Sequence, residues 1–435
     1  MKDRARSQTA PTSDPNPAVS QECYCPGQKG RAACPSGIAR GGTRAHRVTM
    51  CAMNSQKTSV RWLVSALILG ISVGSFHLLL VGAVAPPVPA RLTDQEFWKL
   101  SRDSSEDDGY FRSDNLLSNE TTFQYIIPKL LQTAKQGRVY VGVGPEQNFT
   151  YMAALKPTMA IIIDIRHGNL DVHLLYKAIF EMSKDRADFV SRLFSRKRPD
   201  GLTAQSTVAQ IFDAYSRVNG SREIYEENLK AIKDQLQKKH AFPLTAGDLE
   251  GIEWALSNYY QFGPSISYNS SLSAGVAPEI VGASSGAGRN GGRNMVNYGT
   301  LMVADDGAGL QRSFLASEDS FLYLKDLETR NLVVPVVGDF GGPKAIRAVG
   351  GYLRSIDAKV SAFYVSNVEQ FLTQGGIYDT FCASTLTMPL DETSIFIRSG
   401  PGGAYSTGGY PGGSVETSWT GNILSELSHC SAPRR

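Results

Sequence analysis

One stretch of the chain combines two hydrophobic periodicities, and the remaining sequence can be arranged around it. Valines at every second position of 139–143 predict a strand, because alternate residues of a strand face the same side. Gly142 and Gly144 then predict a tight turn, since glycine adopts backbone conformations that other residues avoid. A helical stretch over 148–155 and an apolar run over 159–163 complete a strand–turn–helix–strand unit.

The rest of the chain continues this alternation of strands and helices. Further apolar runs predict strands over 332–337, 360–365 and 393–397. Alternation of this kind predicts an α/β fold with a Rossmann-like, doubly wound, mostly parallel sheet. Helical periodicity between 170 and 260, where a third strand would be expected, predicts a helical insertion after the second strand. Helices are expected over 94–100, 118–136 with a kink or a restart at Pro128, 170–196, 204–218, 222–240, 246–260, 317–329 and from Pro343 onwards.

The first residues of the chain have a different composition from the rest. Residues 1–49 are rich in Arg, Pro, Gly, Ser and Ala with almost no periodic apolar pattern, which predicts a disordered leader. Met50 and Met53 precede a more conventional N-terminal sequence, and a start at either would leave this leader untranslated. Residues 50–61 form a basic flank.

Residues 62–85 carry no charge and are long enough to cross a bilayer, which takes about 20 residues. Lys57 and Arg61 precede them, so the positive-inside tendency places the N-terminus in the cytoplasm and the main domain on the non-cytoplasmic side. Residues 83–85 resemble a signal-peptidase site, but Pro86 would hinder cleavage. We therefore expect an uncleaved signal anchor that holds the protein in the membrane.

The folded part is expected to follow a short linker at 86–91 and to span 92–398 as one domain. A glycine- and serine-rich loop over 262–296 interrupts it and lacks the Lys-Ser/Thr pair of a phosphate-binding P-loop, which indicates a flexible segment. Residues 399–435 are expected to be a glycine-rich tail after the folded domain, and residues 400–413 of it are expected to be loose.

Composition narrows the classes of partner. A formal net charge of +3 and the lack of a dense Lys/Arg stripe argue against nucleic-acid binding. Of the six cysteines, only Cys382 lies in expected core, so neither a disulfide framework nor a zinc site is predicted. The sequence leaves the oligomeric state open.

The predicted strand ends concentrate the candidate chemistry. Parallel sheets bind ligands beyond the carboxyl ends of their strands, and an acid twenty residues after the glycine turn is where a ribose-binding carboxylate would lie. The candidate cofactor-binding residues are Gly142, Gly144, Glu146, Asn148 and Asp164.

Polar clusters also follow the later strands, at 338–342 and 366–370. Asp339 and Asn367 could serve a ligand, or they could only cap the helices that follow. The polar stretch 109–121 is likewise open between turn and capping chemistry and a role at the rim of a binding site.

The unit around Gly144, together with VVGDFGGPKAI and AFYVSNVEQF, resembles an uncharacterised bacterial family with a class I S-adenosylmethionine methyltransferase-like Rossmann fold. The resemblance covers about 92–398 and implies S-adenosylmethionine as cofactor, with Asp164 as the ribose-binding acid. Two positions depart from the methyltransferase pattern: Tyr140 replaces the acid before the glycine turn, and Glu146 replaces its third glycine.

Methyl transfer to oxygen or nitrogen requires a positioned acceptor and in some cases a base. The candidate catalytic carboxylates are Glu120, Asp339 and Glu369, and Glu146 is a further carboxylate to test as a base. Neither a Ser-His-Asp set nor a His-Glu-x-x-His motif supports hydrolase or zinc-protease chemistry, and no metal is expected.

Three functions remain open at this point. The first is a membrane-anchored methyltransferase-like protein that binds a nucleoside cofactor and transfers its methyl group. The second is a non-catalytic envelope protein that binds a ligand or partner on a degenerate Rossmann fold, which the departures at Tyr140 and Glu146 favour. The third is a nicotinamide-dependent oxidoreductase, which would suit Asp164 but lacks the three-glycine fingerprint. A domain outside the membrane would not meet the cytoplasmic pool of S-adenosylmethionine, which counts against the first.

Overall fold

The computed structural model describes residues 88–111, 113–268, 270, 296–401 and 416–431. The leader, the basic flank, the expected membrane anchor and most of the glycine- and serine-rich loop lie outside these residues. Within the described residues, no helix is both long and apolar enough to span a membrane.

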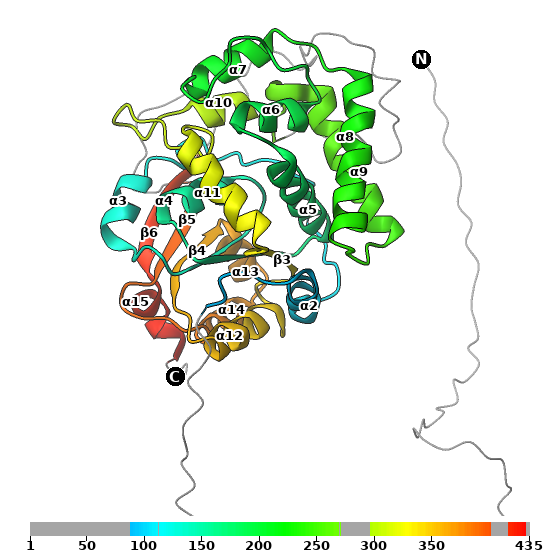
Figure 1. The fold of residues 1–435 in the computed structure, drawn as a ribbon. Helices are drawn as coiled ribbons and strands as arrows, with labels where there is room; N and C mark the ends of the chain where they lie inside the picture. The colour runs from blue at the N-terminus through cyan, green and yellow to red at the C-terminus, as the bar shows by residue number, and fades with distance from the viewer. Residues whose placement is uncertain (1–87, 112, 269, 271–295, 402–415, 432–435) are drawn as a thin grey trace, which may run out of the picture. The chain divides into compact units, whose positions relative to one another are not determined.

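The core of the fold is a six-stranded mixed sheet in an α/β arrangement (Figure 1). Its order is β3-β2-β1-β4-β5-β6, in which the first five strands are parallel and β6 runs antiparallel to β5. All residues of β1, β2 and β3 are buried, as expected for parallel strands that are covered on both faces. The strands are β1 Val139–Gly142, β2 Met159–Asp164, β3 Val333–Val337, β4 Val360–Ser366, β5 Ile395–Pro401 and β6 Glu416–Asn422.

Helices pack on both sides of this sheet (Figure 1). One group comprises α2 (Asp94–Ser104), α12 (Ala345–Ser355), α13 (Val368–Gln374) and α14 (Tyr378–Thr385). The other comprises α3 (Ile127–Thr133), α4 (Gln147–Leu155), α5 (His167–Met182) and α11 (Glu318–Thr329). Their apolar faces fill the core, as in α12, where Ile346, Val349 and Leu353 recur at helical spacing and are buried.

The described parts of the connection between β2 and β3 contain helices and no strand of the sheet, which confirms the predicted position of these helices along the chain (Figure 1). The expected single helix over 170–196 is wrong, because α5 ends at Met182 and Asp185 caps a new helix by accepting the N–H of Asp188. The helices that follow α5 are α6 Arg186–Phe194, α7 Val208–Ser216, α8 Arg222–Asp234 with a π-helical turn η1 at Gln235–Lys239, α9 Ala246–Phe262 with a 3-10 turn η2 at Gly263–Ser265, and α10 Tyr298–Val303.

The expected helix over 118–136 is shorter than predicted. Residues 121–126 form turns, and α3 begins at Ile127 with Pro128 in its first turn. Proline is favoured there because its missing N–H would have no partner in the helix. The restart at Pro128 is therefore confirmed.

A buried ionic network joins the helices after β2 to the rest of the fold. The Nζ of Lys177 donates to Glu181 Oε1 at 2.8 Å, and both side chains are almost fully buried. His240 lies between Asp94 Oδ1 at 2.6 Å and Glu181 Oε2 at 2.7 Å. Burial opposes the charge of Glu181, but the bonds from His240 and Lys177 outweigh it and lower its pKa to about 2. On α11, burial raises the pKa of Glu328 to about 8.

The C-terminal part of the chain corrects two expectations. Residues 416–431 are not a tail after the folded domain: they form β6, the helix α15 (Ile423–Leu427) and the 3-10 turn η3 (Ser428–Ser431). Cys430 in η3 forms a disulfide with Cys382 in α14, so the expectation of no disulfide was wrong. The strand β6 exists because β5 offers it an edge, with pairs such as Phe396 and Gly421. The remaining glycine-rich residues, 402–415, lie outside the described residues.

Candidate functional site

A cavity of about 590 Å³ lies at the carboxyl ends of the central parallel strands. Its wall includes Gly144 after β1, Asp164 at the end of β2, Asp339 after β3 and Ser366 at the end of β4. The chain runs from β1 outwards to β3 and then returns to place β4 on the other side of β1. Crevices at this reversal of strand order are the usual ligand sites of open α/β sheets.

The glycine turn after β1 is fixed by protein side chains. The amide nitrogen of Asn148 donates to the carbonyls of Val143, Gly144 and Pro145 at 2.8–3.0 Å. The Gly144 carbonyl also accepts from His173 Nε2 at 2.9 Å. Burial lowers the pKa of His173 to about 4, so the ring is neutral at pH 7 and carries its proton on Nε2 to make this bond.

Gly144 itself requires glycine and faces open space. Its φ of +78° lies in the left-handed region, and a Cβ there would meet nothing within 4 Å. It lines the cavity, whereas Gly142, Glu146 and Asn148 do not. A Cβ on Gly142 would lie 2.0 Å from Asn148 Oδ1, so that glycine makes room for the side chain that holds the turn.

Tyr140 has a structural partner behind the same turn. Its hydroxyl donates to Asn148 Oδ1 at 2.8 Å, and burial raises the pKa of Tyr140 well above its ordinary value. The hydroxyl therefore stays protonated and orients the Asn148 amide towards the turn. Tyr140, which stands where the methyltransferase pattern has an acid, thus stabilises the turn from inside the core.

Glu146 is fully buried behind the cavity wall. Its Oε1 accepts the N–H of Ser118 at 3.2 Å, and its Oε2 has no hydrogen-bond partner within the described residues. Burial raises the pKa of Glu146 to about 8, so the side chain is mainly a neutral acid at pH 7. Its position favours a structural role over ligand contact.

Asp164 lines the cavity but is already paired with Arg166. Its Oδ1 accepts from the backbone N–H and the Nε of Arg166, and its Oδ2 accepts from the other side of the guanidinium, all at 3.0 Å. Burial disfavours the guanidinium charge, but Asp164 outweighs this effect and raises the pKa of Arg166. Arg166 also donates to the carbonyls of Ser113 and Asn115, which fixes the rim segment over the end of β2.

Glu120 is the most densely hydrogen-bonded carboxylate of the cavity wall. It is 1% exposed and accepts from five neutral side chains. Within the part of the chain that the structure describes, no lysine or arginine forms an ion pair with it. Its donors are Gln147 of α4, Tyr364 and Ser366 of β4, Ser399 of β5 and Ser418 of β6.

Ser366 shows backbone strain at this point. Its φ of +50° is unusual for a residue with a Cβ, and the pairing of β4 with β5 shifts register beside it. Its hydroxyl donates to Glu120 Oε1 at 2.7 Å. Strain of this kind collects at ligand sites, which agrees with the position of Ser366 in the cavity wall.

The two remaining candidate carboxylates differ in position. Asp339 lines the cavity, and its Oδ1 accepts the N–H of Gly341 at 2.8 Å, while no bond to its Oδ2 occurs among the described residues. The cap of α12 comes instead from Glu106, which accepts the N–H groups of Lys344 and Ala345. The structure therefore leaves Asp339 available to the cavity.

Glu369 does not line the cavity. It pairs with Arg398 of β5, which donates to its Oε1 at 3.1 Å and also bonds to its Oε2. Tyr378 donates to the same carboxylate at 3.0 Å. The structure thus brings Glu120 and Asp339 together but leaves Glu369 in a separate ion pair.

Several residues that line the cavity were not predicted as site residues from the sequence. Arg166 could have been proposed as a wall residue from the sequence, because it stands two residues after the predicted acid, Asp164. Tyr110 and Phe111 line the cavity, so the segment 109–121 contributes to its rim. Aromatic and apolar side chains, including Phe340, also line the cavity.

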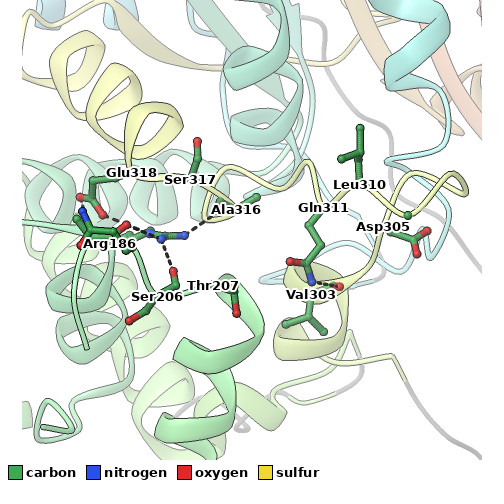
Figure 2. A pocket seen from close by; sticks show the side chains of 13 residues that line it. Arg186, Ser206, Thr207, Val303, Asp305, Leu310, Gln311, Ala316, Ser317 and Glu318 are labelled. Carbon is green, nitrogen blue, oxygen red and sulfur yellow. Dashed lines mark hydrogen bonds and ion pairs between the residues drawn. The ribbon is translucent and has the colours of Figure 1, made fainter. Parts of the chain in front are cut away.

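A second pocket, of about 490 Å³, lies beside α11 and α7 (Figure 2). Arg186 is the only arginine or lysine among the described residues of its lining. The donors of Arg186 are taken by Glu318, Leu315, Ala316, Ala204 and Ser206. A guanidinium occupied in this way has no donor left for an anionic ligand. This pocket therefore offers less chemistry than the cavity at the strand ends.

These observations define an α/β protein with a cavity at the carboxyl ends of a mostly parallel sheet. Residues 116–244 and 294–423 match a family described as a domain of unknown function, DUF7790. The match covers more than half of the chain, so the chain belongs to this family. No match was found among curated proteins.

Proposed function

We propose that this protein binds an adenosine-containing cofactor of the S-adenosylmethionine type in the cavity at the strand ends. One observation carries the proposal: among the described residues, the wall holds three carboxylates, Glu120, Asp164 and Asp339, and one guanidinium, Arg166. A wall with net negative charge attracts the sulfonium and ammonium groups of S-adenosylmethionine. It repels the pyrophosphate of a dinucleotide such as NAD.

The sheet supports a doubly wound, Rossmann-like fold of the methyltransferase-like class. Its first five strands have the order expected for that architecture. Helices between β2 and β3 would then be an insertion into that scaffold.

The residues present fit the cofactor on three counts. The Asp164 carboxylate accepts three hydrogen bonds from Arg166, and a carboxylate has about four acceptor sites, so it can still bind a ribose hydroxyl. Gly144 exposes an open backbone at the turn. Ile165 and Phe340 supply apolar surface for a base. The cavity volume lies within the usual range for small-molecule sites, roughly 300–1,000 Å³.

If transfer occurs, the bound cofactor supplies an electrophilic methyl group. Among the wall carboxylates, Asp339 has the oxygen best placed to take a proton from an acceptor, because its Oδ2 makes no bond within the described residues. Glu120 accepts five hydrogen bonds and is better suited to orient polar or cationic groups. Glu369 is held by Arg398 outside the cavity.

A second candidate function is ligand binding without catalysis. The observation in its favour is that Asp164 and Glu120 are both held by protein donors, as expected for a preorganised binding wall. The two functions share the cavity and differ at Asp339, so methyl transfer by the wild type and its loss in Asp339→Asn would favour catalysis.

We further propose that residues 62–85 anchor the protein in a membrane. Cell fractionation with a carbonate wash tests the anchor, and recovery in the soluble fraction would contradict it. Protease protection then reports the side on which the main domain lies. A cytoplasmic domain would meet S-adenosylmethionine directly, whereas an outer location would favour the binding function.

Calorimetry of the full chain in detergent tests the proposed ligand. We expect S-adenosylmethionine to bind more tightly than S-adenosylhomocysteine, which lacks the sulfonium charge, and NAD not to bind. Asp164→Asn should weaken binding by about 10- to 100-fold, as expected for loss of a charge-assisted hydrogen bond. The matched variant Asp319→Asn changes an exposed carboxylate and should leave affinity unchanged. Absence of binding by both nucleosides at millimolar concentration would refute the proposal.

A further inference from the structure

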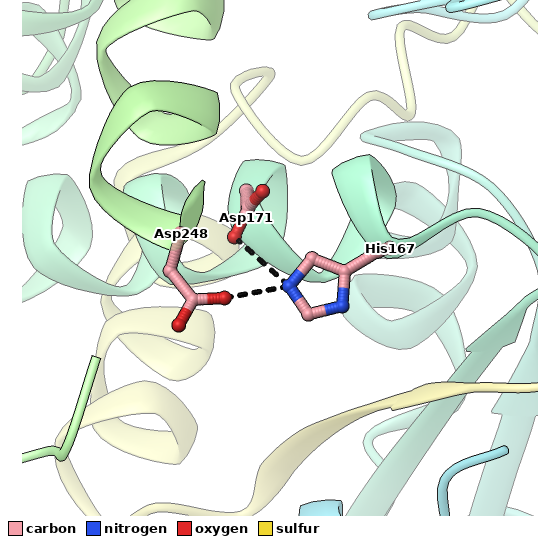
Figure 3. A group of neighbouring side chains, drawn as sticks. All are labelled: His167, Asp171 and Asp248. Carbon is pink, nitrogen blue, oxygen red and sulfur yellow. Dashed lines mark hydrogen bonds and ion pairs between the residues drawn. The ribbon is translucent and has the colours of Figure 1, made fainter. Parts of the chain in front are cut away.

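Three side chains at the start of two helices form a compact cluster outside the cavity. His167 and Asp171 lie one turn apart on α5, and Asp248 lies in the first turn of α9 (Figure 3). One donor atom from each lies within 4.8 Å of the others. The His167 Nε2 is 2.6 Å from Asp248 Oδ1 and 3.8 Å from Asp171 Oδ1.

The cluster has one buried oxygen that nothing in the described residues satisfies. Asp171 Oδ1 has no hydrogen-bond partner, its side chain is only 5% exposed, and it points towards the His167 ring (Figure 3). The ring nitrogen carries at most one proton, which the shorter contact assigns to Asp248. A buried carboxylate oxygen without a partner is costly, and this one faces two other ligand atoms.

The cluster also has no lysine or arginine partner among the described residues: neither Asp171 nor Asp248 forms an ion pair with one. A second buried histidine provides a contrast: His240 bonds Asp94 through Nδ1 and Glu181 through Nε2, on opposite sides of the ring. His240 therefore provides a hydrogen-bond partner for both carboxylates. Because Asp94 and Glu181 contact different ring nitrogens, the two carboxylates and one ring nitrogen cannot bind the same metal ion.

We propose that His167, Asp171 and Asp248 bind a divalent transition-metal cation, with Zn²⁺ as the first candidate. One imidazole nitrogen and two carboxylate oxygens are a ligand set that Zn²⁺ accepts. Tetrahedral bonds of about 2.0–2.1 Å place neighbouring ligand atoms about 3.4 Å apart. The observed separations of 2.6 and 3.8 Å lie on either side of this value, so small side-chain movements suffice.

The surroundings support a built site. Asp248 Oδ2 accepts from the backbone N–H of Thr245 at 2.6 Å and from its hydroxyl at 2.9 Å, which fixes the carboxylate so that Oδ1 faces His167. A Cβ on Gly251 would lie 2.1 Å from Asp171 Oδ2, so this glycine gives the second carboxylate its space. His167 is 29% exposed, which provides an entry path and an open coordination position. The ion would join α5 to α9.

The test is Zn²⁺ binding to the full chain after removal of metal with EDTA. We expect calorimetry to show a site whose affinity falls at least about 100-fold in His167→Gln, since even outer-sphere changes cost 10- to 100-fold. Asp171→Asn retains the side-chain volume and should have the same effect. The exposed His429→Gln should bind Zn²⁺ as the wild type does.

Two further measurements distinguish this site from metal binding elsewhere on the chain. Bound Co²⁺ should give visible absorption without thiolate charge transfer, whereas binding by Cys23, Cys25 and Cys34 would add a strong near-ultraviolet band. Zn²⁺ should also raise the Tm of the wild type but not that of Asp171→Asn. A cooperative thermal unfolding transition of Asp171→Asn in EDTA is the control that this variant folds. Zn²⁺ binding unchanged in both site variants, or no Zn²⁺ binding by the wild type, would overturn the proposal.

Discussion

Replacing Glu146 by glutamine should stabilise the protein at neutral pH and have little effect in acid. The side chain is fully buried, and burial raises its pKa from 4.5 to about 8. Because the folded-state pKa is above the unfolded-state value, the stabilising contribution of the bound proton is complete below pH 4.5. It is lost progressively as the pH rises through 8.

The size of this effect follows from proton linkage. Between pH 4.5 and 8 the unfolded chain releases the proton while the folded protein retains it, so the free energy of unfolding falls by about 1.4 kcal/mol per pH unit. By pH 7 the loss amounts to about 3 kcal/mol. Glutamine is neutral at every pH and has the shape of the protonated acid. Glu146→Gln should therefore match the wild type near pH 4.5 and exceed its stability by about 3 kcal/mol at pH 7.

Urea unfolding of both proteins across this pH range measures the difference directly. Other buried acids, such as Glu328, remain in both proteins, so their pH dependence cancels. The exposed Glu250→Gln is the matched control and should change stability by less than about 0.5 kcal/mol at any pH. A stability difference between Glu146→Gln and wild type that does not vary with pH would show that the Glu146 carboxyl does not keep a raised pKa in the folded protein.

Three further changes test the scaffold around the cavity by urea unfolding. Cys430→Ser opens a disulfide that spans 48 residues and should cost about 4 kcal/mol under oxidising conditions; equal stability in oxidised and reduced wild type would contradict this. Lys177→Met removes the buried cation that pairs with Glu181 and should cost about 3–5 kcal/mol, and a neutral or stabilising result would show that hydrophobic packing can replace the ion pair. Gly142→Ala forces a Cβ against Asn148 and should lower the free energy of unfolding by about 1–3 kcal/mol. The control Gly168→Ala changes an exposed glycine and should be neutral or stabilising, so equal effects of the two changes would count against a tight turn.

Local periodicity was enough to predict the centre of the sheet. Alternating valines mark β1, and continuous apolar runs mark β2, β3 and β4, because buried parallel strands have few other compositions. The strand β6 could not be read in the same way. Its sequence ETSWTGN has no apolar alternation, and it becomes a strand by pairing with β5.

Some residues of the candidate site could likewise be predicted from the sequence, and others could not. Gly144 and Asp164 were predictable because the turn and the acid have a fixed spacing along the chain. The environment of Glu120 was not predictable, since its donors come from positions between 147 and 418 that only the fold brings together. The same holds for the cysteine pair, because Cys430 lies in a segment with few local signals.

A crystal structure with S-adenosylhomocysteine would show whether an adenosine cofactor binds at the carboxyl ends of β1–β4. We expect the nucleoside in the cavity, with a ribose hydroxyl within hydrogen-bond distance of Asp164 and the homocysteine end directed towards Glu120. A nucleoside bound elsewhere, or an empty cavity at saturating ligand, would rule out cofactor binding at these strand ends.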